Sequence, residues 1–423
     1  MENQIIGQNW HQGQKILFRF FFLFAVLYIF PFPIQFIPGA NIIGSWYGNF
    51  FEAFVAWSST SFLGFEEAIK TKPTGSGDTT FDFIQTGLKL GLAFVIGLVW
   101  TVLDRQRTNY DKLLEWLTVL VRYYLAMMML SYGFYKVIQL QFPFPSLRTL
   151  VAPFGDGSPM GLAWKFMGYS PAYNFFTGMG EVVGGLLLFN RKTTTLGAAI
   201  LVAVLSNVVM INICYDVPVK LFSSVLLLFT FFLIALDGHR LLRLFLFNQA
   251  TNPKSYQPHF KDKRFRVGAL VLKLLIVGGL LYSNVSNVLS AQKNYGSKSP
   301  KPPLYGIYNA ATFVLNGDTI PPLLGDTKRW RRLIIDRNNG ANIQDMNDKM
   351  QWRPFVTDTS KQIIVYNKKD TLNYRWAPDS SYLSLDGITN GDTISVIFEP
   401  FDRQNFLLVN RGFNWINEDP YNR

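Results

Sequence analysis

The sequence predicts an all-α transmembrane bundle of about seven spans, followed by a small all-β extramembrane domain. Of its 423 residues, 49% are apolar, 16% are aromatic and only 16% are charged, which is unusual for a soluble chain. Seven segments approach or exceed the ~20 apolar residues that a membrane-spanning helix needs. They lie near residues 16–34, 83–103, 113–140, 173–190, 195–215, 219–236 and 267–289. Beyond them, strand-length runs separated by turn signals predict an antiparallel barrel or sandwich.

The distribution of Lys and Arg predicts the orientation, because cytoplasmic loops retain positive charge. Twelve of these residues fall in the connections 104–112, 191–194 and 237–266, and four fall in the alternate set of connections. The N-terminus is therefore expected in the cytoplasm, and the C-terminal domain in the periplasm of a bacterium. A further apolar stretch at 41–64 would reverse this charge pattern if it crossed the membrane. We expect it to be interfacial or re-entrant.

Changes in composition divide the chain into five parts. The predicted parts are an N-terminal membrane region (1–112, with spans 16–34 and 83–103 and the interfacial stretch 41–64), a membrane core (113–247), a basic cytoplasmic loop with the last span (248–289), a linker (290–303) and a periplasmic β domain (304–423). In the β domain, Asn-Gly and Asp-Gly pairs supply the positive-φ residues that tight turns need.

Composition also limits the chemistry. The net charge of +12 does not indicate nucleic-acid binding, because the Lys and Arg side chains lie in short loops between apolar runs. Cys214 is the only cysteine, which excludes dithiol chemistry within one chain. We expect no metal site, and the lipid bilayer is the first predicted partner.

Polar residues gather at the predicted outer mouth of the bundle. Asp78 lies in a Gly-Ser-Gly-Asp turn, Lys136 ends the third span, and NICYDVPVK (212–220) supplies Asn212, Tyr215, Asp216 and Lys220. A structural interpretation is that Asp216 caps the next helix while Lys220 extends to the lipid headgroups. A functional interpretation is that Asp216 and Lys220 act on an anionic or quinone-like head group, which Asp78, Lys136, Asn212 and Tyr215 help to bind.

Two further ionisable residues lie deep within the predicted spans. Arg122 is nine residues from the inner end of the third span, and Glu181 is eight residues from the outer end of the fourth. At ~1.5 Å per residue both reach a similar depth in a hydrocarbon core ~30 Å thick. Charges at that depth face the bundle interior and pair. The sequence therefore predicts an Arg122 to Glu181 ion pair, either a helix lock or part of a catalytic relay.

Residues 178–237, with an intramembrane Glu, small-residue packing and a basic inner turn, resemble the DoxX-like family of bacterial membrane proteins. Residues 122–142 and 154–170 look like the preceding part of the same unit. The resemblance implies a four-helix core and, as in some members, quinone-linked redox chemistry in the bacterial inner membrane. Its motifs are helix-packing motifs, and none transfers a catalytic residue.

Three functions stay open at this point. The first is a redox protein with quinone as its cofactor at the outer mouth. The second is a noncatalytic subunit or scaffold that presents the β domain to a periplasmic or membrane protein partner. The third follows a more distant likeness to vitamin-K-dependent carboxylase-like domains, in which Lys89, Lys136 or Lys220 would serve as the base.

Overall fold

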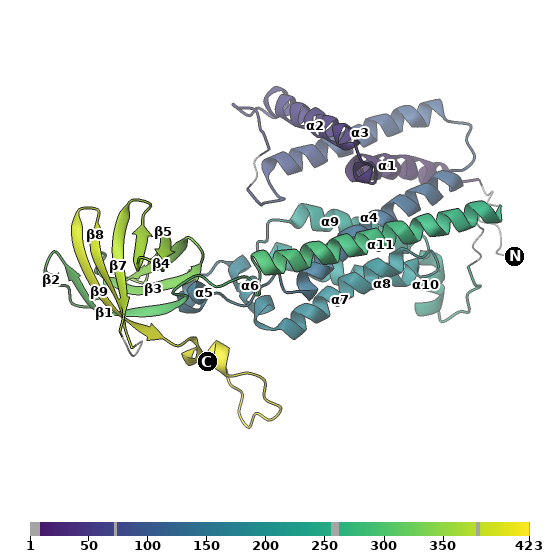
Figure 1. Cartoon of the computed structure of the whole chain (residues 1–423). Helices are drawn as coiled ribbons and strands as arrows, with labels where there is room; N and C mark the ends of the chain where they lie inside the picture. Colours follow the sequence, from purple (N-terminus) through teal and green to yellow (C-terminus); the bar gives the residue numbers. More distant parts are fainter. Residues whose placement is uncertain (1–8, 72–73, 255–261, 378–380, 423) are drawn as a thin grey trace. The chain divides into compact units, whose positions relative to one another are not determined.

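The computed structural model of the protein describes residues 9–71, 74–254, 262–377 and 381–422. They form two compact units: Met1–Gln141 with Ala172–Ser290, and Phe142–Pro171 with Ala291–Arg423. The first unit is helical, and the second carries the β domain (Figure 1). The predicted order, apolar helices followed by an all-β domain, is confirmed.

The helices of the first unit are joined mostly by short turns. They are α1 (Gln12–Ile29), η1 (Ile34–Phe36), α2 (Asn41–Ser61), α3 (Thr80–Leu103), α4 (Asp111–Val137), α7 (Pro171–Leu188), α8 (Thr194–Cys214), α9 (Lys220–Ala235), α10 (Gly238–Phe245) and α11 (Lys263–Asn294).

The number of spans is lower than predicted. Within the described residues, five helical segments are long and apolar enough to cross a membrane, which marks the chain as a membrane protein. They are Gln12–Phe36, α3, α4, α8 and α11; α9 and α10, bent by 73° at their junction, make a sixth if they are counted as one span. The predicted span 173–190 corresponds to α7, which does not qualify because its 18 residues include Asn174, Glu181 and four glycines.

Glycines bring neighbouring helices of the first unit into close contact. A Cβ at Gly178 of α7 would come within 2.8 Å of the Gly133 carbonyl oxygen of α4. A Cβ at Gly197 of α8 would likewise come within 2.9 Å of the Gly184 carbonyl oxygen of α7. Only residues without side chains allow such approach, so these glycines determine which levels of the helices face each other.

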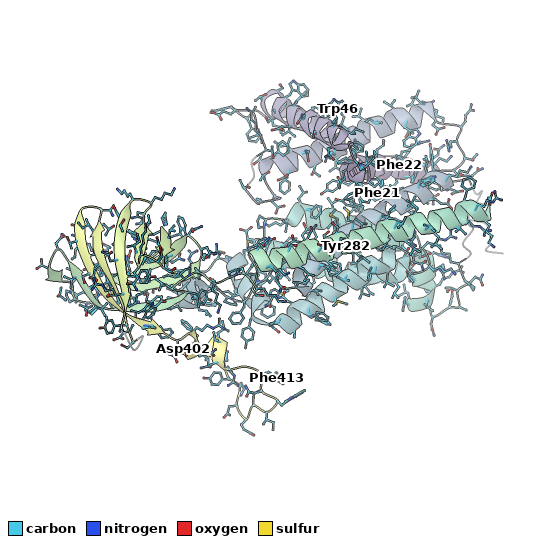
Figure 2. The ribbon with its side chains drawn as sticks, in the orientation of Figure 1. Phe21, Phe22, Trp46, Tyr282, Asp402 and Phe413 are labelled. Carbon is cyan, nitrogen blue, oxygen red and sulfur yellow. The ribbon has the colours of Figure 1, made fainter. Side chains whose placement is uncertain are left out.

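Helix α2, predicted as an interfacial or re-entrant stretch, is a continuous helix of 21 residues. Its buried residues are Phe51, Val55, Ser58 and Ser59, and it packs against α3. The opposite face is aromatic and exposed, with Trp46 extending away from the helix (Figure 2).

The second unit contains an eight-stranded antiparallel barrel. Its elements are α5 (Leu147–Val151), η2 (Phe154–Asp156), α6 (Pro159–Tyr169), β1 (Gly306–Leu315), β2 (Asp318–Thr319), β3 (Trp330–Arg337), β4 (Gly340–Asp345), β5 (Met350–Asp358), β6 (Ile363–Tyr366), β7 (Asp370–Trp376), β8 (Leu383–Thr389), β9 (Asp392–Phe401), η3 (Arg403–Asn405) and α12 (Leu407–Asn410). Pairing of β1 with β9 closes the barrel, and β2 only extends β1 as a short hairpin. Apolar side chains such as Leu333, Leu372 and Val396 form its buried core.

Two details of this domain differ from expectation. The sequence favours a strand at 406–412, but that segment contains the short helix α12 and lies after the strand that closes the barrel. The sequence does not predict strands β4 and β5, because GANIQD has a single β-branched residue and Pro354 interrupts MQWRPFVTD.

Candidate functional site

The central feature of the helical unit is a buried ion pair between α4 and α7. The Lys136 ammonium lies 2.6 Å from Glu181 Oε1, and the two residues are only 6% and 2% exposed. Gly178, one turn before Glu181, lies against the backbone of Gly133 and the Cβ of Lys136. None of the described residues donates a hydrogen bond to the second carboxylate oxygen, Oε2. This oxygen is therefore a buried acceptor without a hydrogen-bond partner among the described residues.

The predicted Arg122 to Glu181 ion pair is wrong. Arg122 Nε instead donates to the carbonyl oxygen of Leu188, at the last residue of α7. Lys136 is 14 residues further along α4, a rise of roughly 21 Å. The depth estimate failed because the first turns of α7 extend past the end of α4, so Glu181 reaches only the last turn of α4.

Tyrosines lie next to the buried pair. The Lys136 ammonium is 6.0 Å from the Tyr132 ring centre, and Tyr132 is close enough to Glu181 to interact electrostatically. Tyr28 and Tyr124 interact in the same way with Tyr132. In the described part of the chain, the hydroxyls of Tyr28, Tyr124 and Tyr132 have no hydrogen-bond partner. These three tyrosines are therefore a group of polar side chains beside the pair.

A second buried lysine lies beyond Tyr28. The Lys89 ammonium is 5.4 Å from the Tyr28 ring centre, 5.7 Å from that of Tyr47 and 5.1 Å from that of Phe51. Its one hydrogen bond, to Gln85 Oε1, is long at 3.4 Å. Sequence reasoning named Lys89 only as a candidate base and missed the rings, because Tyr47 and Phe51 belong to α2, whose packing no sequence pattern indicates.

Three of the remaining predicted residues, Asp78, Asp216 and Lys220, form a separate cluster at the start of α9. Asp78 accepts hydrogen bonds from the backbone N–H groups of Lys220 at 2.8 Å and Leu221 at 2.9 Å. The loop between α2 and α3 therefore caps this helix. The Lys220 ammonium lies 2.8 Å from Asp216 and 3.7 Å from Asp78. The expectation that Asp216 caps α9 is wrong, because its backbone is left-handed (φ 52°) and its side chain is 84% exposed.

Asn212 and Tyr215 have different surroundings. Asn212 is buried and donates to Ser223 Oγ at 3.0 Å, which ties the end of α8 to the start of α9. Tyr215 is exposed at the end of α8. Asn212 is thus a packing residue, while Tyr215 borders the Asp78, Asp216 and Lys220 cluster along the chain. Within the described residues, no group of three or more His, Cys, Asp and Glu side chains is placed to hold a metal ion.

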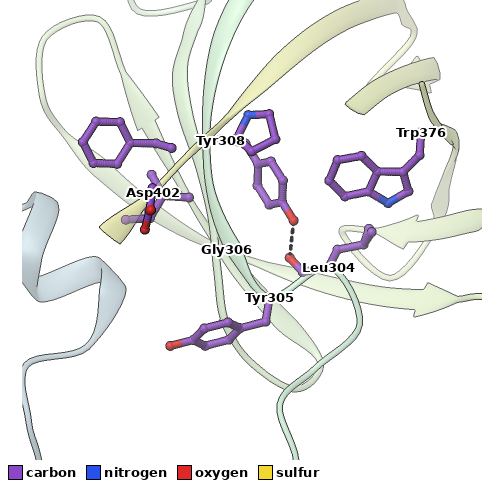
Figure 3. A pocket seen from close by; sticks show the side chains of 9 residues that line it. Leu304, Tyr305, Gly306, Tyr308, Trp376 and Asp402 are labelled. Atoms are coloured by element: carbon purple, nitrogen blue, oxygen red, sulfur yellow. Dashed lines mark hydrogen bonds between the residues drawn. The ribbon is translucent and has the colours of Figure 1, made fainter. Parts of the chain in front are cut away.

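The barrel has a groove of its own, of about 500 Å³, at the start of β1 (Figure 3). Tyr305, Tyr308, Trp376 and Phe401 line it together with Asp402. Burial raises the pKa of Tyr308 to about 12, and its neutral hydroxyl donates to the Leu304 carbonyl oxygen. The groove offers aromatic faces and one carboxylate.

These features define a helical membrane protein with a buried Lys–Glu pair, joined to a β-barrel. The chain is 33% identical to the uncharacterized protein YwoB of Bacillus subtilis over 124 residues, which cover 29% of this chain and 79% of that protein. The chain belongs to the same family as YwoB. No known family profile and no solved structure matches it.

Proposed function

We propose that the protein is a DoxX-like bacterial inner-membrane protein whose bundle binds a quinone-like head group at the Lys136 to Glu181 pair. The observation that carries this proposal is the pair itself, buried at the end of α4 with one carboxylate oxygen unused. An ammonium donates to a quinone carbonyl oxygen, and a carboxylate accepts from the hydroxyl of the reduced form. The pair would thereby hold either redox form of the head group by a hydrogen bond.

The surroundings of the pair support a planar aromatic ligand. Tyr132 supplies a ring face and a hydroxyl beside Lys136, and its ring centre lies 6.1 Å from that of Phe222 on α9. Aromatic rings pack against the ring of a quinone, while hydroxyls without partners bond its oxygens. Asp216 is exposed, Lys220 is partly exposed, and the two are paired with each other, so they suit an entrance better than a catalytic centre.

The proposal includes the predicted topology, with the N-terminus in the cytoplasm and the C-terminal domain in the periplasm. Helices α1 and α3 run antiparallel, since Phe20 lies opposite Gly97 and Tyr28 opposite Lys89. In this topology the end of α1 and the start of α3 lie on one side of the membrane, so the connection that contains α2 begins and ends on that side. Helix α7 packs antiparallel between α4 and α8 and would cross with them despite its polar residues.

Quinone content after mild purification tests the proposed site. The wild-type protein should release quinone on solvent extraction, and the variant Lys136→Met with Glu181→Gln should release at least tenfold less at equal protein amount. Glu67→Gln is the matched control, because it removes an exposed charge outside the proposed site and should retain quinone. Equal quinone in all three proteins, or none in the wild type, would contradict the proposal.

A second candidate function is a scaffold whose barrel binds a partner. The aromatic groove beside Asp402 favours it, because such a surface offers a partner ring faces and one acceptor. Co-purification of a stoichiometric protein with the wild type, and its loss from Trp376→Ala with Tyr305→Ala, would support this function. Retention of that protein by the groove variant would contradict it.

A further inference from the structure

Helix α10 follows α9 after a sharp bend, which polar contacts of Asp237 stabilise. Two residues separate it from the end of α9, and the two helices are bent by 73° at this break. Asp237, in the bend, is 6% exposed and accepts hydrogen bonds from the Thr195 hydroxyl of α8 and from the Lys254 ammonium, the latter at 2.7 Å. Arg240 Nη1 lies 3.6 Å from the same carboxylate. These contacts fix the direction in which α10 departs.

The two faces of α10 differ completely in chemistry. With 100° between successive helix positions, His239, Arg240 and Arg243 fall on one arc. The opposite arc holds Leu241, Leu242, Leu244 and Phe245. Phe245 is 80% exposed and Leu242 53% exposed, and the apolar run continues through Leu246 and Phe247, at 69% and 60%. No described part of the chain covers this face.

An apolar face of this kind is unstable in water but suits the boundary between headgroups and acyl chains. A helix that follows a membrane span and turns by 73° continues close to the membrane plane, which is the orientation this boundary requires. The basic arc then lies at headgroup level. Arg191 and Lys192, in the turn before α8, add positive charge close to Thr195.

We propose that α10 is an in-plane interfacial helix that binds anionic phospholipid through its basic arc. Arg240, Arg243, Arg191 and Lys192 would contact the phosphate headgroups, while Phe245 and its apolar neighbours would contact the acyl chains. Charge complementarity selects anionic lipid over zwitterionic lipid, because each basic residue at the surface attracts negative headgroups. Asp237 holds the helix at this depth.

Depth labelling tests the position of the helix. In a Cys214→Ser background, bimane attached to Phe245→Cys in reconstituted vesicles should be quenched by doxyl lipids and little by aqueous iodide. The same label at Arg243→Cys, on the other face, should be quenched mainly by iodide. Strong iodide quenching at both positions would place α10 in water and overturn the proposal.

Lipid retention tests the ligand. Native mass spectrometry in mixed phosphatidylglycerol and phosphatidylcholine should show preferential phosphatidylglycerol adducts on the wild type, reduced roughly tenfold in Arg240→Gln with Arg243→Gln. The matched control, Arg105→Gln with Arg107→Gln, removes the same charge from another loop and should keep them. Equal loss in both variants would mean a response to net charge alone and would overturn the lipid site.

Discussion

Removing one member of the Lys136 to Glu181 pair should be far more damaging than removing both. At 2.6 Å and an effective dielectric constant of 20, the attraction between the charges is about 6 kcal/mol. Desolvation of two buried ions offsets most of it, so the pair contributes little net stability. Lys136→Met leaves an uncompensated carboxylate and should cost about 3 to 5 kcal/mol, while Glu181→Gln in the same chain should restore much of that loss.

The assay is a double-mutant cycle on unfolding free energy in detergent, followed by size-exclusion chromatography of each variant. We expect a coupling energy above about 2 kcal/mol, because Lys136 and Glu181 are in direct contact through a hydrogen-bonded ion pair. Lys136→Arg, which keeps the charge, is the control for altered size. A coupling energy below about 0.5 kcal/mol, with all variants folded, would refute the assignment of Lys136 as the partner of Glu181.

Three smaller predictions follow from other contacts. Arg122→Met and Glu181→Gln should be additive in melting experiments within about 0.5 kcal/mol, because Arg122 bonds Leu188 instead; strong coupling would restore the pairing predicted from sequence. Asp78→Ala should cost about 1 kcal/mol as the lost cap of α9, whereas Asp216→Ala should stay within about 0.5 kcal/mol; the reverse order in thermal unfolding would disprove the cap. Truncation after Asn410 should leave the β circular-dichroism signal unchanged, because β1 and β9 already close the barrel; loss of that signal would count against the closure.

Sequence patterns predicted the elements better than their contacts. Hydropathy located the helices around Glu181 and Arg122, and the depth rule correctly marked both as buried. The partner was missed because it depends on the relative shift of α4 and α7, which the contact between Gly133 and Gly178 determines. A shift of this kind leaves the hydropathy of either helix unchanged. Composition therefore cannot reveal it.

The same limit applies to the barrel and to the loop before α3. Asn339 and Asn390, each followed by glycine, do form left-handed turns between strands, as their sequence predicts. The Asp386 and Gly387 pair instead lies inside β8, where Gly387 packs against the backbone of Thr371. Asp78 caps a helix more than 140 residues away, and no local capping pattern contains that information.

The two buried lysines should respond to substitution to very different extents. Among the residues that the structure describes, no carboxylate lies within ion-pair distance of Lys89, and three aromatic rings contact its ammonium instead. Lys89→Met therefore leaves no buried carboxylate without a partner. The substitution loses cation–π attraction of about 0.5 to 2 kcal/mol per ring. It also removes the cost of burying a cation, which is roughly several kcal/mol.

The two terms nearly cancel, so Lys89→Met should change the unfolding free energy by less than about 1 kcal/mol, against the 3 to 5 kcal/mol expected for Lys136→Met. Both variants delete one ammonium at membrane depth, which makes each the control for the other in the same melting experiment. If Lys89→Met were as damaging as Lys136→Met, its charge would have to be balanced by an acid and not by Tyr28, Tyr47 and Phe51. A loss of quinone without a loss of stability would instead extend the proposed site along Tyr28 to Lys89.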